Sequence, residues 1–190
     1  IEDKDFYQHT GINFFGGILR ALKDMLFTHT LQGGSTLTQQ LVKNSLLTPE
    51  RTLQRKIKEI ILAFFTERVY SKNEILAMYL NQIPFGGTAY GLEASTETYF
   101  GKKAQDLTLA ESALLAGLPA APSLYSPFGS NPELAKHRQS LVLQKMLNLK
   151  FIDQEEFASA SAEPLKYNPA SVSMKAPHFV LYVKDLLVQK

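Results

Sequence analysis

The chain has 190 residues, of which 45% are hydrophobic and 20% charged, with 20 Lys and Arg against 18 Asp and Glu. That length and apolar content fit one globular domain with a sizeable core. The small net charge and the lack of a groove-reading motif exclude a nucleic-acid partner. There are no cysteines, and the four histidines show no ligand spacing, so we expect no disulfide and no metal site built on these residues.

No run of about 18 uncharged apolar residues is present, so we expect no transmembrane helix in the chain. The first motif begins at Glu2 and no signal peptide precedes it, which suggests a fragment of a longer protein. We treat residues 1–190 as one domain. The absence of cysteine is compatible with an extracytoplasmic location.

The chain begins with the acidic residues Glu2, Asp3 and Asp5, which alternate with Lys4 and lead to Phe6. Acidic residues at a chain start usually cap a helix or lie in solvent, and we interpret Asp5 in that way. Glu2 and Asp3 become candidate site residues only together with the motifs that follow.

Residues 12–27 mix bulky apolar side chains with a glycine pair and a few cations. Two interpretations remain open. The stretch is either a buried helix or a surface element whose apolar side chains enter the acyl region of a membrane while Arg20 and Lys23 meet headgroups.

A glycine pair at 33–34 precedes a helix start. Thr36 followed by Gln39 predicts a capping box, and two glycines allow backbone conformations closed to other residues. The N-terminus of such a helix favours an anion. A polar face follows at helical spacing, formed by Thr36, Gln40 and Lys43. The alternative is a capped surface helix with its polar residues in water.

The next predicted helix runs from Pro49 to Val69, with Thr48 as its N-cap. Its core stripe is expected from the helical repeat of Leu53, Ile57, Ile60, Ile61 and Phe64. Cations and a carboxylate follow one another elsewhere on the helix, at Arg51, Arg55, Lys56 and Glu59. Two arginines at i, i+4 repel each other, so this face favours a bound anion, although a solvated charged face remains the alternative.

Further helix starts are predicted from capping pairs at Ser71/Glu74, Thr108/Glu111 and Asp153/Glu156, and from Asn131-Pro132. The first of these helices should stop near residues 84–87, the second near Gly117, and the helix after Pro132 near Leu149. Strand-like alternation is nearly absent; residues 171–174 are too few to decide, and residues 178–188 are either a helix or a linker. The pattern predicts an all-α domain.

Five motifs occur in a fixed order over residues 2 to 102. They are ED-x-x-F-x-x-H-x-G, GGSTLTQQL-x-KN, RKIKEI at 55–60, KNEILAMYLN at 72–81, and a segment ending in YFGK at Lys102. This series resembles family 51 glycosyltransferases, the peptidoglycan-polymerising domain of class A penicillin-binding proteins, and is most similar to the 1A type. The resemblance implies a lysozyme-like helical fold with a small membrane-facing jaw subdomain at about residues 12–45. It also implies a membrane anchor and a transpeptidase domain in full-length relatives, both absent from this chain.

The resemblance further implies an inverting transfer in which lipid II is polymerised into β-1,4 glycan strands and undecaprenyl diphosphate is released. Glu2 would be the general base and Glu59 the second essential carboxylate. Substrate-binding roles would fall on Asp3, Phe6, His9, Ser35, Thr36, Gln40, Lys43, Asn44, Arg51, Arg55 and Lys56. Three roles stay open for Glu59: orienting Arg55 and Lys56, holding a divalent ion such as Mg²⁺ or Mn²⁺, or assisting departure of the diphosphate.

The expected partners are lipid II, the growing lipid-linked strand, the membrane surface and the inhibitor moenomycin, at the extracytoplasmic face of the bacterial cytoplasmic membrane. Two other function classes stay open. A lysozyme-like lytic transglycosylase would need a carboxylic acid for its alcohol leaving group rather than a cationic face. A non-catalytic cell-wall or membrane binding module would need neither Glu2 nor Glu59.

Overall fold

The computed structural model of the chain describes residues 1–11, 35–48, 50, 52–87 and 89–168. Within them every regular element is a helix, apart from an isolated bridge between Pro84 and Tyr90, which confirms the all-α prediction. In chain order the elements are α2 (Leu37–Leu46), α3 (Leu53–Val69), α4 (Lys72–Gln82), α5 (Leu92–Phe100), η2 (Ala104–Asp106), α6 (Leu109–Gly117), η3 (Leu118–Ala120), α7 (Pro122–Tyr125), α8 (Pro132–Asn148) and α9 (Gln154–Ala162).

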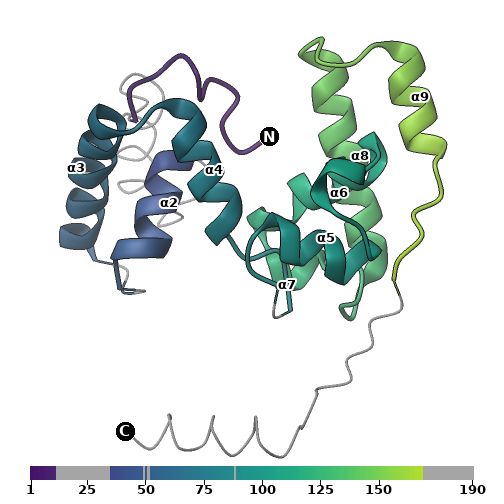
Figure 1. Ribbon diagram of the computed structural model, residues 1–190, viewed down its shortest axis with the longest axis horizontal. Coiled ribbons are helices and arrows are strands. Elements are labelled where there is room, and N and C mark those ends of the chain that lie inside the picture. Colours follow the sequence, from purple (N-terminus) through teal and green to yellow (C-terminus); the bar gives the residue numbers. More distant parts are fainter. Residues whose placement is uncertain (12–34, 49, 51, 88, 169–190) are drawn as a thin grey trace, which may run out of the picture.

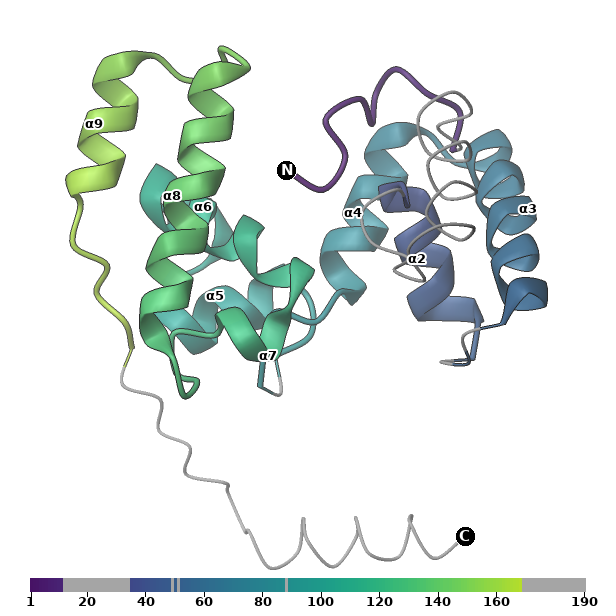
Figure 2. The same ribbon diagram turned by 180° about the vertical axis from the view of Figure 1, so that it is seen from behind.

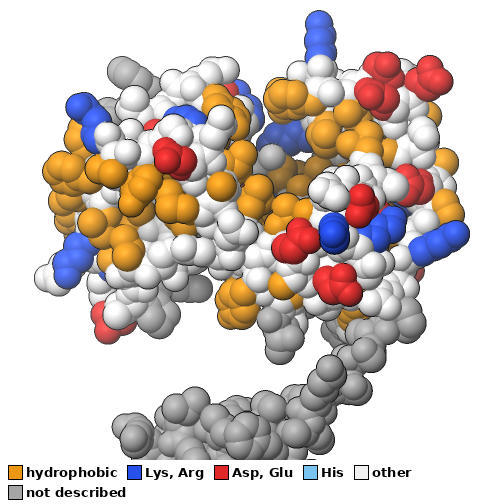
Figure 3. All heavy atoms as spheres, in the orientation of Figure 1, with side chains coloured by type: hydrophobic (Ala, Val, Ile, Leu, Met, Phe, Trp, Pro, Cys, Tyr) orange, Lys and Arg blue, Asp and Glu red, His pale blue; other side chains and the backbone are white. Residues whose placement is uncertain are grey.

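The helices divide into two halves (Figure 1; Figure 2). Helices α2, α3 and α4 form one half, α5 to α9 form the other, and the amino-terminal segment, residues 1–11, lies across the end of the first half with residue 1 between the two. The space-filling view shows a hollow between the halves (Figure 3). A pocket of about 210 Å³ lies here, lined by side chains from the amino-terminal segment, α2, α4 and α8.

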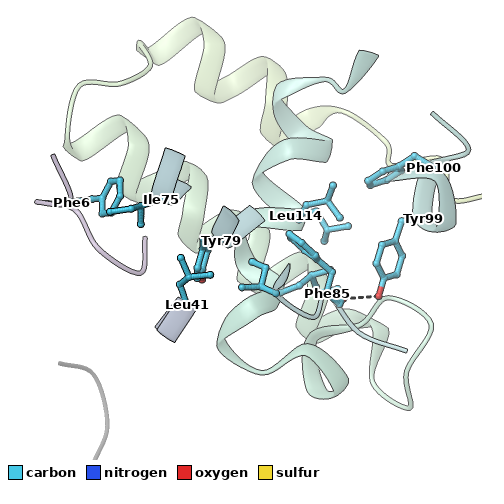
Figure 4. Packing of buried hydrophobic residues seen from close by; sticks show 12 residues of the cluster. Phe6, Leu41, Ile75, Tyr79, Phe85, Tyr99, Phe100 and Leu114 are labelled. Atoms are coloured by element: carbon cyan, nitrogen blue, oxygen red, sulfur yellow. Dashed lines mark hydrogen bonds between the residues drawn. The ribbon is translucent and has the colours of Figure 1, made fainter. Parts of the chain in front are cut away.

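One hydrophobic cluster joins the two halves, and α4 lies at its centre (Figure 4). Ile75 and Tyr79 of α4 are buried, and Phe6 and Leu41 pack beside them. The cluster continues into α5 and α6 through residues such as Tyr99, whose hydroxyl donates a hydrogen bond to the Phe85 carbonyl at 2.8 Å. A second cluster lies between α6, α8 and α9. Burial of α4 therefore fixes the position of one half relative to the other.

The predicted capping boxes are confirmed. The N-cap side chain accepts from the N3 amide and the N3 side chain accepts from the N-cap amide at Thr36/Gln39, Ser71/Glu74, Thr108/Glu111 and Asp153/Glu156. The helix predicted after Asn131-Pro132 is confirmed as α8. These signals are local, because both partners lie three residues apart.

The predicted start of α3 was wrong. The N-cap is Thr52, whose hydroxyl accepts from the Arg55 amide at 3.1 Å, so the helix begins at Leu53 rather than at Pro49. The predicted core stripe was also wrong. Leu53, Ile57 and Ile61 are exposed and Ile60 and Phe64 are only half-buried, whereas the buried residues of α3 are Glu59 and Ala63.

Helices α5 and α7 were not predicted. Helix α5 begins after Gly91 with no capping side chain, and its Ser95, Thr96 and Thr98 hydroxyls donate back to carbonyls of the preceding turn. Such residues are poor helix formers, so tertiary burial stabilises this helix. Residues 12–34, Pro49, Arg51, Thr88 and 169–190 lie outside the described residues, and with them the sequence expectations for 12–27, 33–34, 171–174 and 178–188. No described helix has the length and apolar character needed to cross a membrane.

The connection between the halves turns at Gly86, which has a φ of +108°. A Cβ atom there would lie 2.6 Å from the Tyr99 hydroxyl and 2.8 Å from the Pro122 carbonyl oxygen, both of which belong to the α5–α9 half. Neighbouring Gly87 has a φ of +57° and open space around the position of a Cβ atom. The two glycines therefore share a positive φ but differ in packing.

We expect Gly86→Ala to lower the free energy of unfolding by about 3 kcal/mol, because strained backbone and a close contact add together. Gly87→Ala, the matched control, should cost about 1 kcal/mol, which is the left-handed backbone penalty alone. Chemical denaturation measures both values. Equal costs at the two positions would show that the close approach at Gly86 relaxes freely.

Candidate functional site

The buried face of α3 holds a carboxylate between two cations. Glu59 is 1% exposed. Arg55 donates from Nη1 to Glu59 Oε2 at 2.8 Å, and the Lys56 ammonium pairs with Oε1. Lys56 Nζ also donates to the Ser35 hydroxyl at 2.8 Å. We call these four residues the Glu59 cluster: Ser35, Arg55, Lys56 and Glu59.

The Glu59 cluster carries more positive than negative charge. One carboxylate faces two cations, which leaves one positive charge without a partner in the cluster. The Nε atom of Arg55 is buried and has no hydrogen-bond partner among the described residues. Both cations are partly exposed, and a buried N–H without a partner is costly, so the cluster is set up to accept a further anion.

The amino-terminal segment presents a second carboxylate, Asp3, to the start of α2. Asp3 Oδ2 accepts from the ring of His9 at 2.8 Å and from the backbone amide of Leu37 at 3.1 Å. The amide of Gly11 donates to His9 Nδ1 at 3.2 Å. Because Nδ1 accepts that hydrogen bond, the ring N–H that faces Asp3 is on Nε2, and it donates to Asp3 Oδ2.

Asp3 therefore occupies the helix N-terminus at which the sequence predicted an anion. The Leu37 amide is bonded to Asp3, and the Gln39 amide is bonded to the Thr36 hydroxyl at 3.2 Å. The Thr36 hydroxyl also donates to the Gly11 carbonyl at 2.8 Å. An anion does lie at this helix start, as the helix dipole favours, but the chain itself supplies it.

Glu2 lies apart from these bonds, at the boundary of the two halves. Its side chain is partly exposed, and Arg138 Nη2 of α8 lies 3.3 Å from Glu2 Oε1. Arg138 is itself held, because its Nε donates to the Gly117 carbonyl at 3.2 Å and its guanidinium lies 5.4 Å from the centroid of the Tyr125 ring. The α5–α9 half thus orients the carboxylate that the other half presents.

Other predicted residues lie around this core. Phe6 is buried, and Gln40 accepts from the Tyr79 hydroxyl at 3.2 Å. Lys43 and Asn44 are exposed and make no side-chain hydrogen bond or ion pair with any described residue. Arg51 lies outside the described residues. Among the described residues no group of three or more His, Cys, Asp or Glu could hold a metal ion.

Sequence reasoning missed two residues at the site, Arg138 and Tyr79. Arg138 is 136 positions from Glu2, and nothing in a single sequence links them. Tyr79 lies inside the motif at residues 72–81, but no site role was predicted for it. Burial, and after it the negative charge of Glu2, raises the pKa of the Tyr79 phenol, so this hydroxyl stays protonated and acts as a donor. A tyrosine inside a motif that also holds charged residues was the available signal.

Comparisons with known proteins identify the family of this chain. The Transglycosylase family model matches residues 1–147. Penicillin-binding protein 1A of Aquifex aeolicus is 43% identical over 100% of this chain and 26% of its own length, and that of Escherichia coli is 44% identical over 97% and 22%. The crystal structure of penicillin-binding protein 1A from Haemophilus influenzae superposes with a TM-score of 0.52 at 31% identity, over 80% of this chain and 19% of that one.

The chain spans about a quarter or less of the length of these relatives. Its match to the family model nevertheless covers the amino-terminal segment and all helices from α2 to α7, with nearly all of α8. The candidate site falls entirely within that range. The chain belongs to the transglycosylase family, family 51 of the glycosyltransferases.

Proposed function

We propose that this domain is a peptidoglycan glycosyltransferase that polymerises lipid II into β-1,4 glycan strands with inversion at the anomeric carbon. The observation that carries the proposal is the contrast between two carboxylates. Glu59 is buried among excess positive charge, whereas Glu2 is partly exposed and faces the boundary between the halves. The environment of Glu59 suits a departing anion, and the environment of Glu2 suits a base.

In the proposed reaction Glu2 takes the proton of the 4-hydroxyl of the acceptor as its oxygen attacks the anomeric carbon of the donor. The bond from that carbon to the diphosphate oxygen breaks, and undecaprenyl diphosphate leaves with the electron pair. Negative charge grows on the diphosphate, and the net positive charge that Arg55 and Lys56 keep beside Glu59 stabilises it. Because this leaving group is a stable anion, no acid is needed to protonate it.

Glu59 serves in this proposal as the group that orients Arg55 and Lys56. A carboxylate bonded to both cations fixes their directions before substrate arrives, which is the preorganisation that electrostatic stabilisation requires. A divalent ion, Mg²⁺ or Mn²⁺, would have to bind beside the diphosphate rather than replace these contacts. Moenomycin, whose phosphoglycerate resembles the diphosphate, is expected to compete for the same position.

The membrane contact is proposed for α3, because residues 12–34 lie outside the described part of the chain. Leu53, Ile57, Ile61 and Phe65 recur every four residues and are 49–61% exposed. They lie on the opposite side of the helix from Glu59. Hydrophobic surface gathers over α3 in the space-filling view (Figure 3). A lipid-linked substrate keeps its tail in the bilayer, so a membrane-facing helix would bring the Glu59 cluster close to it. We propose that the domain works at the extracytoplasmic face of the cytoplasmic membrane.

The first test concerns the base. Glu2→Gln keeps the shape of the side chain but cannot take a proton, so polymerisation of lipid II should slow by about 10²-fold or more. Asp5→Asn is the control, since Asp5 lies in the same segment and pairs with exposed Lys4. Gel analysis of the polymer, with moenomycin as the inhibited reference, measures both. Wild-type polymerisation by Glu2→Gln would remove Glu2 from the role of base.

The second test concerns the diphosphate. Lys56→Met removes a cation of the Glu59 cluster, and turnover should fall by about 10²-fold, more than apparent substrate affinity, because the charge matters most as the diphosphate leaves. Lys58→Met is the matched control, because Lys58 is exposed two residues along the same helix. Steady-state kinetics with lipid II separates the two parameters. Equal small effects of both substitutions would show that the cations are merely solvated.

The third test concerns the membrane. Replacing Ile57 and Ile61 by Ser should weaken binding to anionic vesicles by about 2 kcal/mol, roughly thirtyfold, through lost apolar burial. Leu141→Ser, at an exposed apolar position on α8, should change binding little. Vesicle sedimentation measures the partition. Unchanged binding in the Ile57/Ile61 variant would mean that α3 does not face the membrane.

A further inference from the structure

A second buried carboxylate lies on the same face of α3, about two turns after Glu59. The Glu67 side chain is 5% exposed, and its position follows Glu59 and Ala63 at i+4 spacing. It accepts from the Thr38 hydroxyl of α2 at 2.5 Å and pairs with the Lys72 ammonium of α4 at 2.7 Å. Glu67 thus connects the three helices of the first half.

The Glu67 pair differs from the Glu59 cluster in its charge. One carboxylate meets one ammonium and one hydroxyl, so no charge is left over. A neutral, fully bonded arrangement has nothing to offer an anionic substrate. Glu67 and Lys72 also contact none of Glu2, Asp3 and Glu59 through any described hydrogen bond or ion pair. We therefore assign these two residues no direct part in the chemistry.

The pair nevertheless contacts the segment that presents Glu2 and Asp3. Lys72 Nζ lies 4.4 Å from the centroid of the buried Phe6 ring, within the range of a cation–π contact. Gly11, at the other end of this segment, packs so closely against α3 that a Cβ atom would lie 2.9 Å from the Ala63 carbonyl oxygen and 3.2 Å from Glu67 Cγ. Phe6 therefore rests on Lys72, and Gly11 packs against α3 where Glu67 adjoins Ala63.

We propose that Glu67 and Lys72 are positioning residues that act through Phe6 and Gly11 to hold the amino-terminal segment, and hence Glu2 and Asp3, in the reactive arrangement. This inference rests on the proposed function for its kinetic consequence. Its structural part is independent of that function. A displacement of about 1 Å in a catalytic group lowers rates by up to 10²-fold, so loss of this support should act on turnover.

The test uses Lys72→Met, which keeps the length of the side chain and removes its charge. We expect kcat for lipid II polymerisation to fall at least about tenfold while KM changes less than about threefold. Lys72→Arg keeps the charge and the contact with the ring, and should restore most of the rate. Glu67→Gln is the second variant, and its kcat should lie between those of Lys72→Met and Lys72→Arg. It replaces Lys72→Met if that protein does not fold.

The matched control is Lys102→Met in the other half of the domain. Lys102 also pairs with a buried carboxylate, Glu111, at 2.7 Å. Both residues are about 90 or more positions from the amino-terminal segment in the sequence. Lys102→Met should lower the melting temperature by about as much as Lys72→Met does, and should leave kcat within about twofold of the wild-type value. Equal losses of kcat in Lys72→Met and Lys102→Met would reduce Glu67 and Lys72 to general stabilising residues and overturn the proposal.

A second measurement, hydrogen exchange of a backbone amide, does not depend on enzymatic activity. The Leu37 amide lies in the first turn of α2, where it has no partner within the helix, and its described bond goes to Asp3. Lys72→Met should speed its hydrogen exchange about tenfold or more, and Lys102→Met should not. Unchanged exchange at Leu37 would overturn the positioning role. If the wild-type protein makes no polymer, the proposed function fails, and this exchange measurement still decides the present inference.

Discussion

The buried carboxylate of Glu59 is the constraint on which the site depends. A charge removed from water is tolerated only when it is paired and bonded, and here Arg55, Lys56 and through Lys56 the Ser35 hydroxyl supply those contacts. To make them, α3 must turn its charged face toward α2 and leave an apolar face outside. The orientation of the helix, the position of the cations and the exposed apolar stripe of Leu53, Ile57, Ile61 and Phe65 are thus one consequence of where Glu59 lies.

The same helix face carries two carboxylates with different balances of charge. Around Glu59 cations are in excess, and the Arg55 Nε atom is buried without a partner among the described residues. Around Glu67 charges cancel, and the contacts run to Thr38 and Lys72. In our account the excess at one end of α3 binds a departing diphosphate, while the neutral pair at the other end holds the segment that bears the base. One helix therefore supports both parts of the proposed transfer, and Arg138 connects that segment to the other half of the domain.

The sequence was sufficient for features set by near neighbours and insufficient for those set by distant ones. The capping boxes and the Arg55–Lys56–Glu59 group were predicted because their members lie within four residues of one another. The buried face of α3 was predicted on the wrong side of the helix. Apolar periodicity identifies an apolar stripe, but it does not show whether another part of the protein covers that stripe. The occupation of the α2 start by Asp3, 34 positions from Leu37, and the approach of Arg138 to Glu2 depend on tertiary packing that no local pattern encodes. The contacts that a single sequence could not predict are those that join the amino-terminal segment to α2 and α8.

The central claim is that the excess positive charge around Glu59 binds the diphosphate of the donor. A crystal structure of the domain with a short-chain prenyl diphosphate tests it most directly. The account predicts phosphate oxygens within hydrogen-bond distance of the Arg55 guanidinium and the Lys56 ammonium, with the Glu59 contact to Arg55 retained. A diphosphate bound away from these two side chains, while both keep only Glu59 as their anionic partner, would contradict it.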